Sequence, residues 1–234
     1  MKQIHFESVD STNTYLKQNY KQLENFTFVS ADIQTQGRGR NNRKWDSDNN
    51  NLLFSLLIKD KNILKKVNEV SIISAYIIIK VLQEYGIDDL SIKWPNDVYA
   101  GNKKICGILL ESISTNELEC LIVGVGVNVN QSEFDLDYNA TSMNIINNTD
   151  IDISSLKKNV YSKFESFLNS VSSGSDYYLE ISKYDYLKNK EVYALINNEK
   201  KLVKVKGINS DYSLCVVSNE SEYNLYSGEI SFHI

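Results

Sequence analysis

The sequence predicts an α+β protein in which a mixed β-sheet with packed helices precedes a small β-barrel. The larger part of the chain alternates strand-like runs with segments of helical apolar spacing. From about Lys188 onward the pattern contains only short strands separated by polar turns, which is typical of a small barrel. We therefore expect two domains, residues 1–187 and residues 188–234.

The expected helices are indicated by capping residues and by apolar spacing. Asp10-Ser11 has the residue types of a helix N-cap, and Gly86 directly follows a long run with apolar residues at helical spacing. A third run has the same amphipathic spacing, and a fourth is short. The expected helices span Thr14–Tyr20, Leu64–Tyr85, Leu156–Val171 and Asp176–Lys183.

The expected strands are apolar or alternating runs bounded by turn-forming residues. Leu52–Ile58 is apolar apart from Ser55, which suits a buried strand. The Asn- and Asp-rich segment Asn130–Asp152 is expected to be a loop. The larger domain has expected strands at residues 1–10, Phe26–Gln34, Leu52–Ile58, Leu90–Trp94, Val98–Ala100, Lys104–Ser112 and Leu118–Val129, and the tail at Val192–Ile196, Leu202–Ile208, Leu214–Val217, Tyr223–Tyr226 and Glu229–Phe232.

Composition narrows the classes of protein that fit. With 234 residues and 42% hydrophobic residues the chain can bury a sizeable core, and its net charge of −5 disfavours a general polyanion-binding surface. Three widely spaced cysteines without a C-x-x-C pair indicate neither a disulfide framework nor a zinc knuckle, and fit a reducing cytosol. We expect a cytoplasmic protein, because no apolar run approaches the length of about 20 residues needed to span a membrane and the N-terminus lacks a signal peptide's apolar region.

Arginine is confined to one segment. The chain has 22 lysines but only three arginines, Arg38, Arg40 and Arg43, all in the loop Gly37–Trp45. An arginine differs from a lysine by a planar fork that binds phosphate or carboxylate through two bonds. A lone R-G-R would most simply be a solvated or RNA-contacting loop, but the confinement of arginine and the adjacent Trp45 favour a bound anion and a purine. The segment is not a P-loop, since G-x-x-x-x-G-K-[ST] is absent from the chain.

Two further segments combine polar residues with strand ends. In Lys93-Trp94-Pro95-Asn96-Asp97 the proline ends a strand, which leaves an amide and a carboxylate at a place where Mg²⁺ and polar substrate atoms are commonly held. Taken alone, such a segment is more often a turn. In Lys103–Glu111 we expect Lys104 to begin a strand, and Gly107, which has no side chain, to leave space beside it. The ammonium group of Lys104 could then reach a ligand, although a lysine at a strand entrance is most often solvated.

Two weaker signals complete the set. Gly124-Val125-Gly126-Val127-Asn128 continues as a strand, so it does not support a dinucleotide fingerprint, and its alternate small residues leave room on one sheet face. Ser11-Thr12-Asn13 stands at a helix start, where capping alone would normally explain it.

Taken together, these segments resemble the biotin protein ligase family. Ser11-Thr12-Asn13, Gln34, GRGRxxRxW, KWPND, KKICGILLE and GVGVNVN follow in that family's order, and Gly207-Ile208-Asn209 and Ser227-Gly228-Glu229-Ile230 resemble its terminal barrel. The resemblance implies the class II synthetase-like fold of biotin and lipoate ligases, with a biotin- and ATP-binding catalytic domain at 1–187 and an SH3-like barrel at 188–234. We expect a monofunctional type without the N-terminal winged-helix repressor domain of bifunctional members.

The resemblance also implies a reaction and its partners. The family makes biotinyl-5′-AMP from biotin and Mg-ATP, and transfers biotin to a lysine of a carrier domain of acetyl-CoA carboxylase or another biotin-dependent carboxylase. We expect no DNA partner, no membrane, and a monomer or homodimer. A lipoate–protein ligase of the same fold is the alternative, and a nucleic-acid-binding protein is a poorer one. We also expect the segment Thr35–Asn51 to be mobile without ligand and to close over the adenylate.

Roles for individual residues follow from the same resemblance. Lys104, Arg40 and Asp97 are the implied catalytic residues, and Mg²⁺ is expected with ATP near Asn96 and Asp97 without an assigned ligand set. The implied biotin-binding residues are Ser11, Thr12, Asn13, Gln34, Gly37, Arg38, Gly39, Arg40, Lys104 and Gly107. The implied ATP- and AMP-binding residues are Arg40, Arg43, Trp45, Lys93, Asn96, Asp97 and Asn128.

Overall fold

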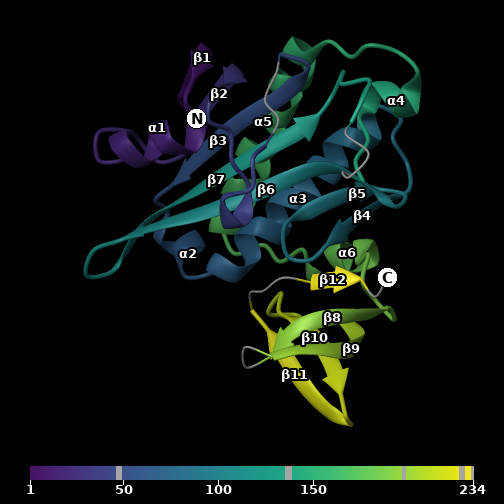
Figure 1. Ribbon diagram of the computed structural model, residues 1–234. Helices are drawn as coiled ribbons and strands as arrows, with labels where there is room; N and C mark the ends of the chain where they lie inside the picture. Colours follow the sequence, from purple (N-terminus) through teal and green to yellow (C-terminus); the bar gives the residue numbers. More distant parts are fainter. Residues whose placement is uncertain (46–48, 135–138, 197–198, 227–229, 233–234) are drawn as a thin grey trace.

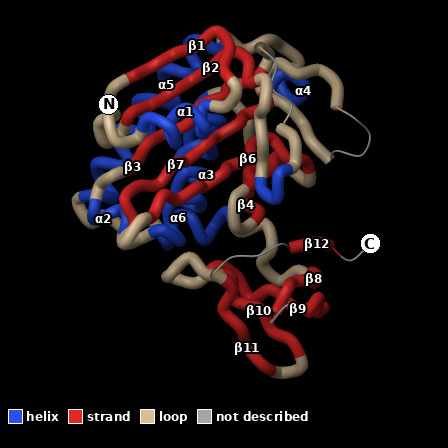
Figure 2. Tube along the Cα trace, turned by 60° about the vertical axis from the view of Figure 1, so that its left-hand side comes forward, coloured by secondary structure: helices blue, strands red, loops and turns tan. Residues whose placement is uncertain are grey.

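A seven-stranded sheet with helices forms the larger part of the molecule, and a second, smaller sheet lies beside it (Figures 1 and 2). The computed structural model describes the chain except for residues 46–48, 135–138, 197–198, 227–229 and 233–234. The expected turn Asn197-Asn198 and the segment Ser227-Gly228-Glu229 therefore lie outside the described residues. None of the helices in the described part is long and apolar enough to cross a membrane.

The larger sheet is mixed, with the order β1-β2-β3-β7-β6-β5-β4. Its first two strands are parallel and all its other neighbouring strands are antiparallel. A mixed, mostly antiparallel sheet with packed helices belongs to the expected α+β class. The strands are β1 (Gln3–Val9), β2 (Thr27–Gln34), β3 (Asn51–Ile58), β4 (Leu90–Lys93), β5 (Asp97–Ala100), β6 (Lys103–Ser114) and β7 (Leu118–Asn128).

The two faces of this sheet are covered differently. Phe54, Leu56 and Ile58 of β3 belong to a large core with the helices α3 (Val67–Glu84) and α5 (Ile153–Ser172). Leu57, between them in sequence, packs on the other face against Leu16 of α1 (Thr12–Asn19). Because strand side chains alternate between faces, β3 is buried on both sides, and the expectation of a buried strand is confirmed.

Several expected boundaries differ from the structure. The long helix begins at Val67 instead of Leu64, because the Asp60 side chain accepts bonds from Asn62 N and Ile63 N and caps a separate one-turn helix, α2 (Lys61–Leu64). The first helix begins at Thr12 rather than Thr14, with Ser11 as its cap. The other helices start or end within two or three residues of expectation: α5 begins at Ile153, α6 spans Tyr178–Ile181, and a 3₁₀ turn follows at Ser182–Tyr184.

The expectation of a loop over Asn130–Asp152 is wrong for residues 143–147. A short helix, α4 (Met143–Asn147), lies within it. The Ser142 side chain caps its start by accepting from Ile145 N, and Asn148 in a left-handed conformation ends it. With only Met143 buried, this helix has no apolar periodicity that the sequence could reveal.

The second sheet is antiparallel, with the order β11-β10-β9-β8-β12. All five strands expected in the tail are present, and the sheet is consistent with the expected small SH3-like barrel. Its strands are β8 (Glu191–Ile196), β9 (Glu199–Ile208), β10 (Leu214–Ser218), β11 (Ser221–Leu225) and β12 (Ile230–Phe232).

The two sheets are joined by buried contacts around Trp94. The indole Nε1 of Trp94, which is only 2% exposed, donates to the carbonyl oxygen of Tyr212 at 3.1 Å. Nearby, Ile92 of β4 forms an isolated bridge with Asp185, whose carboxylate accepts from Ile208 N of the second sheet at 3.0 Å. One cluster of buried residues consequently continues from the larger sheet into the smaller one.

This joint predicts a stability effect of Trp94→Phe. The substitution keeps an aromatic ring but removes the donor to the Tyr212 carbonyl, which should lower the free energy of unfolding by about 1–3 kcal/mol. Urea denaturation measures it. The control is Tyr226→Phe, which removes a bond to Asp211 from a 55% exposed tyrosine and should cost less than about 0.5 kcal/mol. Equal losses in the two variants would contradict a role for the buried bond.

Candidate active site

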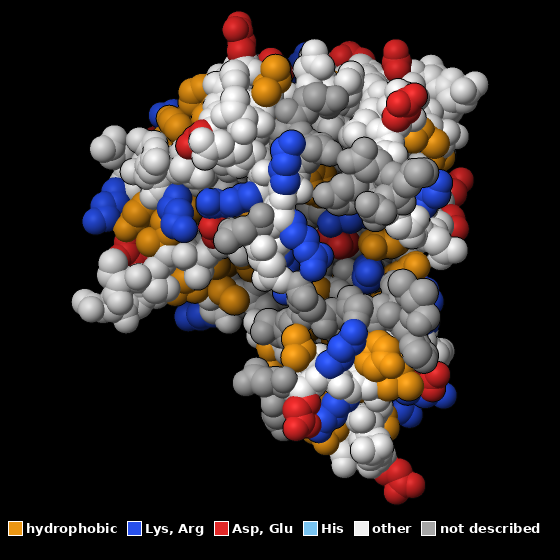
Figure 3. Space-filling view, viewed as in Figure 1, with side chains coloured by type: hydrophobic (Ala, Val, Ile, Leu, Met, Phe, Trp, Pro, Cys, Tyr) orange, Lys and Arg blue, Asp and Glu red, His pale blue; other side chains and the backbone are white. Residues whose placement is uncertain are grey.

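A cavity of about 660 Å³ opens on the face of the larger sheet that carries α1. Lys and Arg side chains gather around a hollow on this face, above the second sheet (Figure 3). Of the residues predicted from the sequence, every one except Gly37 lines the cavity. Gly37 is buried beside it, and its carbonyl oxygen accepts from Trp45 N at 3.0 Å.

Strand alternation brings the segments of the site together. Gly107 on β6 is paired with Gly126 on β7, and Leu109 with Gly124, so these four positions lie side by side on one face. Val125 between the two glycines of β7, and Val123 and Val127 that flank them, belong to the main core on the opposite face. The GVGVN segment therefore forms a floor of small residues, as its alternating pattern indicated.

Trp45 and Asn13 fill the room above that floor. A Cβ atom at Gly126 would lie 2.5 Å from the Trp45 indole, and one at Gly107 would lie 2.8 Å from it. A Cβ at Gly124 would overlap the Asn13 side chain. The glycines are therefore required for close approach of these side chains to the sheet.

The arginine-bearing loop is closed by backbone bonds. Arg38 and Lys44 form an antiparallel bridge, and Gly39 N donates to Arg43 O at 2.7 Å. A 3₁₀ turn, Arg40–Asn42, forms the tip. Of the expected lid Thr35–Asn51, residues 46–48 lie outside the described residues, and its opening and closing remain a prediction.

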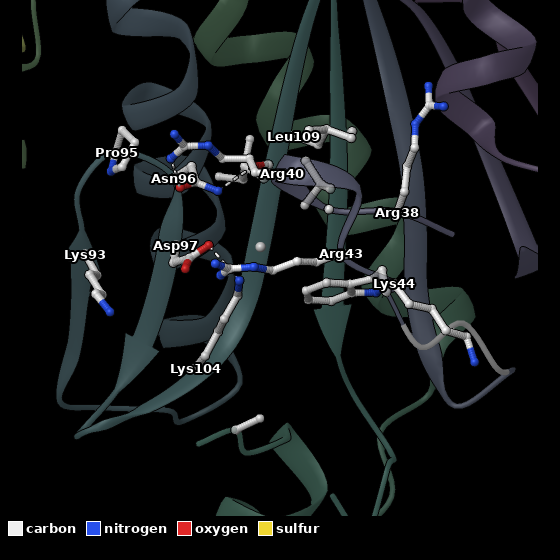
Figure 4. A pocket seen from close by; sticks show the side chains of 18 of the residues that line it. Arg38, Arg40, Arg43, Lys44, Lys93, Pro95, Asn96, Asp97, Lys104 and Leu109 are labelled. Atoms are coloured by element: carbon white, nitrogen blue, oxygen red, sulfur yellow. Dashed lines mark hydrogen bonds and ion pairs between the residues drawn. The ribbon is translucent and has the colours of Figure 1, made fainter. Parts of the chain in front are cut away.

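One hydrogen bond attaches the tip of this loop to Asn96 of the KWPND segment, and a second holds Asn96 on β6 (Figure 4). Arg40 Nη1 donates to Asn96 Oδ1 at 3.0 Å, and Asn96 Nδ2 donates to Ile108 O at 2.8 Å. The next residue, Asp97, lies 2.7 Å from Lys104 Nζ through its Oδ1 atom. The amide and the carboxylate of KWPND therefore orient one cation each from two other segments.

Positive charge is concentrated at this end of the cavity. Burial lowers the pKa of Lys93 below its usual value, and the charges of Lys104, Lys190 and Arg43 lower it further, while Asp97 opposes the shift. Lys104 Nζ also lies 5.4 Å from the centre of the Trp45 ring. An anionic ligand would relieve the repulsion among these cations, so the site is suited to a polyphosphate.

The opposite end of the cavity is polar but nearly uncharged. Gln34 Oε1 accepts from Thr12 N at 2.8 Å, which joins the end of β2 to the start of α1. Ser11 and Asn13 line the same end. Such a set of amides and hydroxyls suits a neutral ligand with several hydrogen-bonding groups. Asn128 lies instead toward Lys104, because its Nδ2 donates to Thr141 O at 3.0 Å and Thr141 N donates to Lys104 O at 2.9 Å.

Sequence reasoning missed several residues of the site. Glu111 and Ser55 bond directly to its polar end, although they are not among the residues that line the cavity. Tyr193, Leu195 and Lys200 reach the cavity from the second sheet. Glu111 ends the KKICGILLE segment and could have been considered, whereas the residues of the second sheet carry no signal because their position depends on how the sheets dock. Cys106, beside the site, is fully buried, and burial raises its pKa, so it is not a reactive thiolate.

Residues 5–128 match the model of the biotin/lipoate A/B protein ligase family. The chain belongs to this family. The matched residues include the arginine loop, KWPND, Lys104 and the glycine floor, and therefore most of the residues that line the cavity.

Solved structures and curated relatives agree with this assignment. The biotin protein ligase of Aquifex aeolicus in complex with biotin and ATP superposes with a TM-score of 0.85 at 31% identity, over 98% of this chain and 97% of that chain. The Bacillus subtilis bifunctional ligase/repressor BirA is 36% identical over 47% of this chain and 34% of that protein. The Paracoccus denitrificans biotin–[acetyl-CoA-carboxylase] ligase is 32% identical over 51% of each. The aligned segments thus span about a third to a half of these curated relatives, while the fold of the solved ligase is matched over its whole length.

The glycine floor leads to a test with Gly126→Ala. The added methyl group would overlap the indole of Trp45, so the ring should leave the floor, with a loss of stability of about 1–3 kcal/mol. Tryptophan fluorescence should shift to longer wavelength because the ring moves into water. Since Trp94 is the second tryptophan, the matched control is Gly126→Ala in a Trp45→Phe background, where the shift should vanish. An unchanged spectrum in the single variant would show that Trp45 does not rest on Gly126.

Proposed function

We propose that the protein is a biotin protein ligase, which activates biotin with ATP to biotinyl-5′-AMP and transfers it to a lysine of a carrier domain. The observation that carries the proposal is the joining of the arginine loop and KWPND around Lys104 in a single cavity. Family membership and the likeness to the Aquifex aeolicus ligase, whose structure contains biotin and ATP, support the choice of substrates.

The first step is an in-line displacement at phosphorus. An oxygen of the biotin carboxylate attacks the α-phosphorus of ATP, a new P–O bond forms, and the bond to the β-phosphate oxygen breaks, which releases pyrophosphate. Such a step needs positioned cations more than a protein nucleophile. We assign Lys104, held by Asp97, as the charge between the carboxylate and the α-phosphate, and Arg40, held by Asn96, as the group that retains the phosphate.

The two ends of the cavity divide the substrates between them. We place the triphosphate at the positive end, with Arg43 and Lys93, and the adenine against Trp45. The ureido group of biotin is neutral and has two N–H donors and one carbonyl acceptor, so we place it at the polar end with Ser11, Thr12, Asn13 and Gln34. We assign Asn128 to the ribose side.

The residues fit a magnesium ion that arrives with ATP. Asp97 is the only carboxylate among the described residues of the lining, and the Asn96 amide oxygen adjoins it in the chain. Within the described part of the chain no group of three or more His, Cys, Asp or Glu could hold a metal alone. Magnesium is usually bound by one or two carboxylates together with substrate phosphates. When bound, it would neutralise phosphate charge, with Asp97 as its protein ligand.

In the second step the amine of the carrier lysine attacks the acyl carbon of the adenylate. A C–N bond forms, the C–O bond to phosphate breaks, AMP leaves, and the amine loses a proton. We propose as acceptor a biotin carboxyl carrier domain, such as that of acetyl-CoA carboxylase, and as compartment the reducing cytoplasm, in which buried thiols such as those of Cys106, Cys120 and Cys215 persist.

A pyrophosphate exchange assay tests the proposed reaction. Labelled pyrophosphate should enter ATP only when both biotin and Mg²⁺ are present, and a carrier domain should become reactive to streptavidin. Lipoate in place of biotin is the control, because the family model also covers lipoate ligases. Exchange without biotin, or equal exchange with lipoate, would contradict the assignment.

A second test concerns Arg40. Lysine keeps the charge but lacks the fork, so Arg40→Lys should lose one charge-assisted bond of about 1.5 kcal/mol and release biotinyl-5′-AMP about tenfold faster. The measurement is the rate at which adenylate leaves the enzyme, together with biotin labelling of lysines on a bystander protein. If the variant releases adenylate at the parental rate, Arg40 does not retain it.

A further inference from the structure

Behind the polar end of the cavity lies a continuous chain of hydrogen bonds. Thr12 Oγ1 lies 2.6 Å from Ser55 Oγ and 3.0 Å from Gln34 Oε1. Ser55 Oγ lies 2.5 Å from Asn13 Oδ1. Thr12, Asn13 and Ser55 are all buried, so the direction of each bond is fixed by the partners within the protein.

Glu111 lies at the end of this series of hydrogen bonds. Its carboxylate accepts from Asn13 Nδ2 at 2.8 Å and from Arg38 Nη2 at 3.1 and 3.2 Å, and Lys17 Nζ lies 3.5 Å away. Burial alone would raise the pKa of Glu111, but the bond from Asn13 and the charges of Arg38 and Lys17 hold it below its usual value. Glu111 is therefore an ionised group that can only accept hydrogen bonds.

An acceptor at one end determines which group donates and which accepts in every hydrogen bond of the series. Because Glu111 only accepts, Asn13 turns its NH₂ group toward it and its carbonyl oxygen toward Ser55. Ser55 must then donate its single proton to Asn13, so its oxygen can only accept from Thr12. The Thr12 proton is thereby committed to a protein atom, whether Ser55 Oγ or the more distant Gln34 Oε1.

The consequence for a ligand concerns Thr12, which lines the cavity. With its proton committed, its hydroxyl oxygen has only a lone pair to offer, and so it accepts from an N–H group and rejects a second acceptor. A ureido group presents N–H donors of this kind, whereas the dithiolane ring of lipoate presents none. The polarity of the Thr12 hydroxyl thus distinguishes these two classes of substrate.

We propose, on the basis of the function above, that Glu111 is a positioning residue that sets the Thr12 hydroxyl as an acceptor for the ureido N–H of biotin. It does not line the cavity and acts through Asn13 and Ser55. Its second contact keeps the Arg38 side chain turned away from Arg40 and Arg43, toward α1 (Figure 4). This leaves Arg40 and Arg43 as the arginine side chains of the phosphate end.

The test is Glu111→Gln, which preserves shape but supplies an amide that can donate. Asn13 can then reverse, the chain loses its fixed direction, and the dissociation constant for biotin, measured by calorimetry, should rise about tenfold. The KM for biotin should rise with it, while kcat and the KM for ATP change less than about twofold. The matched control is Glu119→Gln on β7, where the carboxylate bonds Thr115 and Tyr20 away from the cavity, and its biotin affinity should be unchanged.

A double-mutant cycle distinguishes positioning from a general structural effect. Thr12→Val removes the acceptor itself, so adding Glu111→Gln to it should weaken biotin binding no further. Ser55→Ala breaks the same chain at another point and should show the same non-additivity, which keeps the proposal testable if Glu111→Gln folds poorly. Additive losses, or an unchanged dissociation constant in Glu111→Gln, would overturn this inference alone. A parent protein that binds no biotin would overturn the proposed function and the inference with it.

Discussion

The two-residue period of the central strands is the constraint on which the site depends. Along β7 from Leu121 to Val127 every second residue is a leucine or valine of the core shared with α3 and α5, and the residues between them include the glycines of the floor, Gly124 and Gly126. A shift of one residue in register would place valines under Trp45 and glycines in the core. The same strand therefore provides both the stability of the sheet and the space for a ligand, and neither can change independently of the other.

Electrostatics imposes a second constraint on the opposite ends of one cavity. At the positive end, Asp97 orients Lys104 and Asn96 orients Arg40, and a polyphosphate would neutralise the positive charge that is concentrated there. At the polar end, Glu111 accepts from Arg38 and compensates the charge of this third arginine, which lines the cavity. The same cavity is thus suited to a neutral group at one end and to a polyphosphate at the other, because the two ends differ in charge.

The sequence predicted most of the fold because its strands and long helices have strong periodicity. It failed where a single side chain decides the outcome: Asp60 caps a separate turn before α3, and Ser142 caps α4 inside an Asn-rich segment. Within the site, the lining residues of the larger sheet and its loops that lie in contiguous motifs were found, whereas those of the second sheet, such as Tyr193, were missed. Ser55 and Glu111 were missed because each lies on a regular strand, and their significance arises from bonds to Asn13, which is 42 and 98 positions away from them.

The KWPND segment connects the site to the rest of the molecule. Lys93 lines the phosphate end, Trp94 bonds the Tyr212 carbonyl of the second sheet, and Asn96 and Asp97 orient Arg40 and Lys104. Trp94 therefore lies at the joint between the sheets, while its neighbours in this segment lie at the cavity. Because a strand and its following turn move as one unit, any displacement of the second sheet at Trp94 must also displace the groups that hold Arg40 and Lys104. Docking of the second sheet thus forms part of the geometry of the site, and it also supplies the cavity wall that Tyr193 and Lys200 complete.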